Sequence, residues 1–84
     1  RYGSEPLVND IPDVSEQLSR VEREHEIERA LDQLPERCRR LIDLLYFDVE
    51  EPSYSEIATA MEMPEPSIGP TRARCLEKLK KLLE

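Results

Sequence analysis

The chain has 84 residues, of which 38% are hydrophobic, a length and composition that allow one small domain with a modest core. Its formal net charge of −7 opposes nucleic-acid binding, yet residues 1–52 hold 7 basic and 14 acidic side chains, whereas residues 53–84 hold five of each. No segment approaches the roughly 20 consecutive apolar residues of a membrane span, and no secretory signal is present, so we expect a soluble, cytoplasmic protein without membrane contact. Helix formers dominate and sustained alternating strand patterns are missing, which predicts an all-α fold.

The first twelve residues contain Gly3, Pro6 and Pro12, and they predict a linker or disordered tail over residues 1–12. Residues 13–84 are predicted to form a single domain of four helices.

The first predicted helix begins with Asp13 as its N-cap, with Glu16 three residues later, and runs to about Leu34. Its second half carries the residues expected in the core, which are Ile27, Ala30, Leu31 and Leu34.

The second predicted helix starts at Pro35, because proline is tolerated at the first helical position, where its missing N–H would have no partner anyway. Its apolar side chains form a wide face typical of a helix at the centre of a core: Cys38, Leu41, Ile42, Leu44 and Leu45. The segment 48–52, which ends in Pro52, terminates this helix.

The third predicted helix has the clearest start in the chain, because Ser53 and Glu56 form the S-x-x-E capping box. This helix is short and ends near Met61 or Glu62, and a turn with two prolines follows over residues 63–66. The fourth predicted helix begins with Ser67 as its cap and runs to the C-terminus. Its core-facing residues are expected to be Ile68, Cys75, Leu79 and Leu82, with Leu76 and Leu83 at the margin.

A short capped helix, a turn and a longer basic helix form the pattern of a helix-turn-helix, whose second helix enters the major groove of DNA. In the helical projection, the outward-facing residues of the last helix are Pro70, Ala73, Arg74, Glu77 and Lys81, with Gly69 and Lys80 at one edge. The small side chains near its start let the backbone approach DNA, and Arg74 can reach a phosphate or a guanine edge.

Arg72 projects toward the core side, where it either pairs with an acid of the first two helices or extends out to the surface. The free N–H groups at the start of the third helix are expected to form a binding site for a DNA phosphate.

Few residues indicate any other chemistry. Cys38 and Cys75 lie on apolar helix stripes without CxxC spacing, so we expect buried free thiols, with a disulfide or a metal site as the alternatives. His25, the only histidine, is expected on the surface. Because the chain has no nucleophile–base set and no glycine-rich phosphate loop, we expect no enzymatic activity, no cofactor and no metal site.

From Ala30 onward the sequence resembles region 4, the C-terminal DNA-binding region, of bacterial RNA polymerase sigma factors of the sigma-70 family, in particular the extracytoplasmic-function type. The resemblance rests on the stretches ALDQLPERCRRLIDLLYF and SYSEIATAMEMPEPSIGPTRARCLEKLKKLL. It implies sequence-specific recognition of the promoter −35 element as part of RNA polymerase holoenzyme, and docking on the β-subunit flap of the polymerase core. An anti-sigma factor is a further candidate partner.

The resemblance also implies which positions meet double-stranded promoter DNA. On the recognition helix these are Ser67, Gly69, Pro70, Ala73 and Arg74. Arg39, Tyr54 and Ser55 correspond to positions that contact the DNA backbone. Thr71, Arg72 and Lys78, on the same helix, complete the set of candidate DNA-contacting residues.

The sequence departs from the family pattern at five positions. Two of them are Ala73, which replaces a bulkier residue, and Arg72, which stands where the family tends to be apolar. Glu62 stands where the turn usually has glycine, and a left-handed backbone there would cost on the order of 1 kcal/mol. Gly69 and Thr71 stand where basic residues are usual, which weakens the expected base readout. Two alternatives stay open: a response-regulator-type helix-turn-helix, which would dimerise through its final helix, and a sigma-like interaction domain that docks on polymerase or an anti-sigma partner without strong DNA binding.

Overall fold

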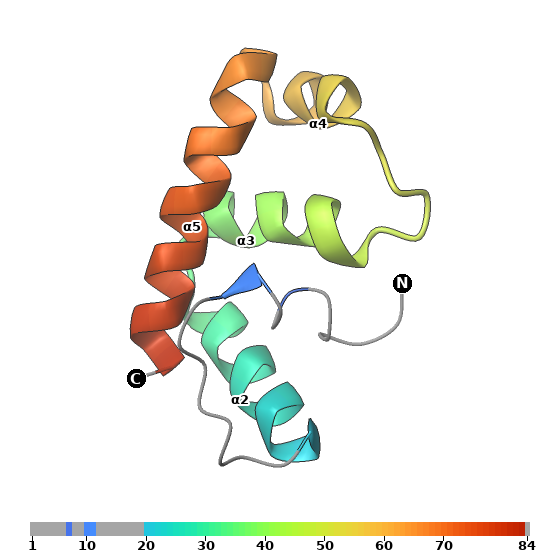
Figure 1. Cartoon of the computed structure of the whole chain (residues 1–84). Coiled ribbons are helices and arrows are strands. Elements are labelled where there is room, and N and C mark those ends of the chain that lie inside the picture. The colour runs from blue at the N-terminus through green and yellow to red at the C-terminus, as the bar shows by residue number, and fades with distance from the viewer. Residues whose placement is uncertain (1–6, 8–9, 12–19, 84) are drawn as a thin grey trace.

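The computed structural model describes residues 7, 10–11 and 20–83, and the part of the chain from residue 20 folds into helices with no strand, which confirms the all-α prediction. The helices are α2 (Arg20–Gln33), α3 (Glu36–Ile42), α4 (Tyr54–Met61) and α5 (Ile68–Leu83), with a π-helical turn η1 (Asp43–Phe47) and a 3-10 turn η2 (Glu65–Ser67). The long helix α5 runs beside the other three and packs against each of them (Figure 1). It is therefore the element that joins the domain together.

The junction between α2 and α3 follows the predicted break at Pro35. This residue is the N-cap of α3, with φ −53° and ψ 143°, one residue outside the predicted helical position. The difference is small because proline lacks the N–H at either position. The predicted helix beginning at Asp13 lies outside the described residues before Arg20, and its second half is helical as predicted.

The π-helical turn η1 changes which residues at the end of α3 face the core. The N–H of Asp48 donates to the carbonyl of Asp43 at 2.9 Å, five residues back, so the backbone is wider here than in an α-helix. As a result Tyr46 is buried, whereas Leu44 and Leu45, predicted for the core face, are only half-buried. The 3.6-residue period assumed from the sequence does not hold through this turn.

Helix α4 and its turn form the first part of the helix-turn-helix. The predicted capping box is confirmed: the Ser53 Oγ accepts from the N–H of Glu56 at 3.1 Å, and the Glu56 carboxylate accepts from the N–H of Ser53 at 3.0 Å. At the other end the N–H of Met63 donates to the carbonyl of Ala58, a hydrogen bond typical of a Schellman ending. Glu62 adopts the left-handed conformation that this ending requires, with φ 55°.

The start of α5 differs from the prediction that Ser67 is its N-cap. The N–H of Ser67 donates to the carbonyl of Pro64 at 3.0 Å, and η2 continues directly into α5. Helical backbone thus begins at Glu65, and Ser67 lies inside it. The sequence pattern failed here because Pro66 also fits the first turn of a helix, so the true start lies before the serine.

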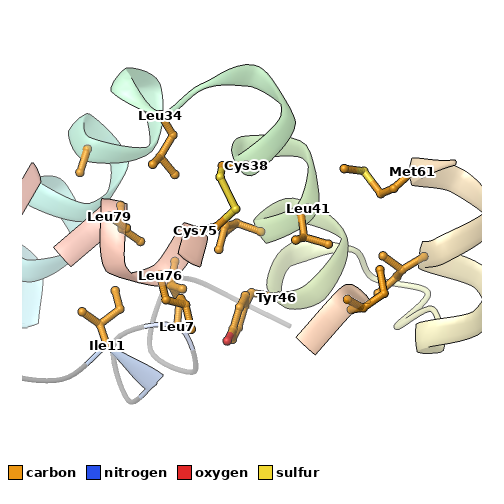
Figure 2. Close-up of a cluster of buried hydrophobic side chains, with 14 of the residues drawn as sticks. Leu7, Ile11, Leu34, Cys38, Leu41, Tyr46, Met61, Cys75, Leu76 and Leu79 are labelled. Atoms are coloured by element: carbon orange, nitrogen blue, oxygen red, sulfur yellow. A yellow bond between two sulfur atoms is a disulfide. The ribbon is translucent and has the colours of Figure 1, made fainter. Parts of the chain in front are cut away.

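The core side of α5 is partly different from the predicted stripe. Ile68, Cys75 and Leu79 are buried as predicted, but Leu82 is 37% exposed, whereas Leu76, predicted at the margin, is only 8% exposed. Leu76 belongs to the same core cluster as two residues from the N-terminal segment, Leu7 and Ile11, and Figure 2 shows the three together. The covered side of α5 is therefore rotated from the predicted stripe toward Leu7 and Ile11.

Leu7 and Ile11 are themselves core residues, with exposed fractions of 0% and 4%. They belong to the stretch 1–12 that the sequence suggested as a linker or disordered tail. That assignment and the domain boundary at residue 13 stay predictions, but these two described residues pack on the domain.

Cys38 of α3 and Cys75 of α5 form a disulfide, so the expectation of free thiols is wrong. Both residues are buried, as expected, and their Cα atoms lie 5.4 Å apart, within the range that a disulfide spans. The pairing depends on how α3 and α5 cross (Figure 2), and a separation of 37 residues in the sequence gives no indication of it.

Candidate nucleic-acid interface

One side of α5, here called its outer face, carries the exposed residues that the helical projection predicted: Pro70, Ala73, Arg74, Glu77 and Lys81. Gly69 lies at the edge of this face, and a Cβ added to it would meet no atom within 4 Å. The first turns of the outer face therefore combine small side chains with open space. Such a surface allows the helix backbone to approach a groove closely.

Arg74 is the basic group nearest to these small residues. Its guanidinium donates to the Thr71 Oγ at 3.3 Å, and both residues lie on the same side of α5. Lys78 is exposed one turn further along. Because residues three and four apart are neighbours on a helix, Thr71 and Lys78 extend the outer face at Arg74 into a continuous polar strip.

Arg72 lies on the opposite, inner face of α5. Its Nε donates to the Tyr46 hydroxyl at 2.9 Å, and its Nη2 lies 2.7 Å from the carboxylate of Asp10, with which it also forms a salt bridge. The guanidinium carbon lies 5.8 Å from the centre of the Tyr46 ring. The predicted inward direction of Arg72 is right, but its acidic partner comes from the N-terminal segment and not from the predicted helices. A contact between Arg72 and DNA would require it to leave these partners.

Tyr46 closes this group, which we call the polar clamp (Asp10, Tyr46 and Arg72), by donating its hydroxyl to Asp10 at 2.7 Å. Burial, and next the hydrogen bond to Asp10, raise the pKa of Tyr46 to about 12. The phenol therefore stays protonated at neutral pH and remains a donor to the carboxylate. The clamp thus joins Asp10 to two elements, η1 through Tyr46 and α5 through Arg72.

The start of α4 holds two further candidates, Tyr54 and Ser55, and both are exposed. The capping box already uses the N–H groups of Ser53 and Glu56. By their position in the first turn, the N–H groups of Tyr54 and Ser55 have no acceptor within the helix, so they are the ones available to a phosphate. The backbone N–H of Ser53, and then its hydroxyl, lower the pKa of Glu56, which favours the charged carboxylate beside these two N–H groups.

Two arginines of α3 hold the far end of α4, and the sequence did not indicate this role. Arg37 donates to the carbonyl of Met61 at 3.3 Å, and Arg40 donates to the carbonyl of Ala60 at 3.0 Å. Since α4 has no basic residue in its own last turn, α3 supplies the donors for these terminal carbonyls. The only available signal was the three-residue spacing of the two arginines, which places them on one side of α3.

Arg39 pairs with α2, unlike Arg37 and Arg40, which donate to α4. Its guanidinium forms an ion pair with Asp32 of α2 at 3.2 Å. Both side chains are largely exposed, so this pair is weak and exchangeable. The structure thus groups the candidates on α5 and places Ser67 just before them in η2, while Arg72 lies on the inner face and Arg39 beside α2.

The basic charge is concentrated on α5, which carries five basic residues and one acidic residue between Ile68 and Leu83. Among the described residues, no group of His, Cys, Asp or Glu is arranged to hold a metal ion. None of the helices described is long and apolar enough to cross a membrane. His25 is exposed, as expected.

The family model for sigma-70, region 4, matches residues 30–81, which is more than half of the chain. The matched segment begins in α2, includes α3, α4 and the turn, and ends in the last turn of α5. It does not include Leu7, Asp10 or Ile11. No curated protein and no solved structure matches the chain. The extracytoplasmic-function type stays a prediction, because the match is to region 4 as a whole.

Proposed function

The chain belongs to the sigma-70 region 4 family, the DNA-binding region of sigma factors in promoter recognition, and from this premise we propose that it recognises the −35 element of promoters as part of RNA polymerase holoenzyme. This family is a DNA-binding one and not enzymatic. Membership in it supports the sigma-type function over the response-regulator alternative.

The outer face of α5 is the observation that carries the proposal. Its first turns present Gly69, Pro70 and Ala73 without bulky side chains, and Arg74 follows within one turn. A recognition helix needs this arrangement, since the backbone must enter the groove before a side chain can reach a base edge. Arg74 is the residue that we assign to base or phosphate contact, with Thr71 and Lys78 beside it.

Helix α4 would lie across the DNA backbone in this arrangement. The N–H groups and side chains of Tyr54 and Ser55 would bind one phosphate. Arg39 would leave its ion pair with Asp32 and bind another phosphate. The hydrogen bonds from Arg37 and Arg40 hold α4 against α3, which would fix the position of these contacts relative to α5. Phosphate contacts of this kind set the register, and α5 supplies the sequence preference.

The net charge of −7 makes intrinsic affinity for DNA low, because nonspecific binding comes largely from phosphate neutralisation. Tethering to polymerase would compensate by raising the effective concentration at the promoter. We therefore include the β-subunit flap among the partners, and an anti-sigma factor as a competitor for the same domain.

A second function, docking on polymerase or an anti-sigma partner without strong DNA binding, is favoured by one specific observation. Gly69 and Thr71 leave the start of α5 without a basic side chain before Arg74, apart from Arg72, which is engaged in the polar clamp. The two functions differ in whether the outer face contributes to DNA affinity.

Fluorescence anisotropy against a panel of randomised duplexes, at low and high salt, tests the proposal. We expect one short motif to be enriched, and Arg74→Ala to weaken binding to it by about 1–3 kcal/mol while stability changes by less than about 0.5 kcal/mol. Arg29→Ala is the matched control, because it removes the same charge from an exposed site on α2. Equal losses in both variants, or no binding at low salt, would favour the docking function instead.

A further inference from the structure

The Cys38–Cys75 disulfide joins α3 directly to the recognition helix. These are the only two cysteines in the chain, and both sulfur atoms are used in the bond. Cys75 follows Arg74 in the sequence, so the covalent link lies on the inner side of α5 at the level of the proposed base contact. Figure 2 shows the bond crossing from one helix to the other.

The place where this domain works makes a purely structural disulfide unexpected. Promoter DNA lies in the compartment where glutathione and thioredoxin keep protein thiols reduced, and the few disulfides that occur there are usually redox-sensing or catalytic. Resting on the proposed function in this respect, we propose that Cys38–Cys75 is a reversible redox site whose substrates are cellular dithiols and disulfides. Its oxidised form holds α5 in the arrangement that binds DNA.

The unequal burial of the two residues sets the direction of the exchange. Both residues are buried, but Cys38 has the larger exposed fraction, 7% against 1% for Cys75, so we assign Cys38 as the side that an attacking thiolate reaches first. The attack forms a mixed disulfide on Cys38 and releases Cys75 as a thiolate, which takes up a proton. The second thiol of the dithiol then displaces Cys38. The protein gains two electrons and two protons, and the dithiol is oxidised to a disulfide.

The elements enclosed by the bond connect this chemistry with DNA binding. The loop between Cys38 and Cys75 contains η1, α4, η2 and the first half of α5, which is the whole helix-turn-helix up to Arg74. Reduction removes the constraint on that loop and leaves α5 attached to α3 by packing alone. A larger part of the reduced population then lacks the binding arrangement, and the apparent affinity falls in proportion.

The first experiment tests the exchange itself on the full 84-residue chain. The oxidised protein is treated with dithiothreitol under native conditions, free thiols are trapped with iodoacetamide, and the mass is measured. We expect both cysteines to be modified together, and oxidised glutathione to restore the bond. A disulfide that resists the dithiol until the chain is denatured would overturn the proposal.

The second experiment measures affinity for the enriched duplex in both redox states. We expect the reduced chain to bind roughly tenfold more weakly, since the binding arrangement becomes a minor population. The Cys38→Ser/Cys75→Ser double variant is the control, and it should match the reduced chain and ignore the redox conditions. Equal affinity of the oxidised and reduced chains would overturn the proposal.

If neither redox state binds any duplex, the proposed function fails, and amide hydrogen exchange then decides the redox inference separately. Faster exchange over residues 53–75 after reduction of the unmutated chain would support it, and unchanged exchange would overturn it. The same measurement serves if the double variant does not fold.

Discussion

The two faces of α5 differ in what their residues contact. On the inner face, Ile68, Cys75 and Leu79 are almost completely buried, and Arg72 is engaged in the polar clamp. On the outer face, Pro70, Ala73 and Arg74 are exposed, and only Arg74 makes a side-chain hydrogen bond among the contacts described. The inner face thus determines where the helix lies, and the outer face determines what it can recognise.

This separation means that a substitution on α5 should affect either stability or DNA binding, according to its face. Arg72 and Arg74 illustrate the point, because they are two residues apart and of the same type. One holds the helix to η1 and the N-terminal segment, and the other is exposed at the proposed interface. Composition alone would count both as basic residues of a DNA-binding helix.

The largest expected effect is on the inner face, from Leu79→Ala. Leu79 is completely buried, and truncating a buried leucine to alanine typically costs about 2–5 kcal/mol of unfolding free energy. Urea denaturation followed by circular dichroism measures the change. Glu77→Ala, on the outer face of the same turn, is the control and should change stability by less than about 0.5 kcal/mol. Similar losses in the two variants would remove the distinction between the faces.

A smaller effect is expected from Asp10→Asn, which takes the charge out of the polar clamp. A hydrogen bond to a charged group contributes about 1.5–3 kcal/mol, and the exposure of Arg72 and Asp10, at 32% and 39% of their side chains, reduces this to about 1 kcal/mol. Thermal denaturation should show the loss. Asp43→Asn removes the same charge from an exposed site outside the clamp, and an equal loss in that variant would show that net charge is responsible.

The smallest expected effect is a pH dependence from the capping box. The pKa of Glu56 is lowered in the folded chain by the N–H and hydroxyl of Ser53, so its contribution to stability is present above the ordinary glutamate pKa. This contribution is lost as the pH falls through the lowered value. Glu56→Gln keeps an acceptor without a titrating group and should reduce the acid dependence of the melting temperature. An identical acid profile in both proteins would contradict the assignment.

The features that could be predicted from the sequence are those set by neighbouring residues. The capping box of Ser53 and Glu56 requires two residues three positions apart, and the outward face of α5 requires only a regular helical period. Both were correct. The break at Pro35 was correct to within one residue, because the constraint on proline is local.

The features that could not be predicted depend on contacts between distant parts of the chain or on irregular backbone. The disulfide requires α3 and α5 to cross at Cys38 and Cys75, and the hydrogen bonds of Arg37 and Arg40 require α4 to end beside α3. The burial of Tyr46 depends on a π-helical turn, which no 3.6-residue projection contains. Of the candidate site, the exposed positions on α5 could be predicted, whereas the inner partners of Arg72 could not.

Leu7 and Ile11 show that the buried core of this protein extends beyond the residues that match the family. The family match covers residues 30–81, yet these two side chains outside it are buried in the same core as Leu76 and Tyr46. A fragment cut at the limits of the match would expose that apolar surface to water and lose the acid that holds Arg72. Homology identifies the part of the chain that is shared with the sigma-70 region 4 family, whereas the buried core also includes two side chains outside that part.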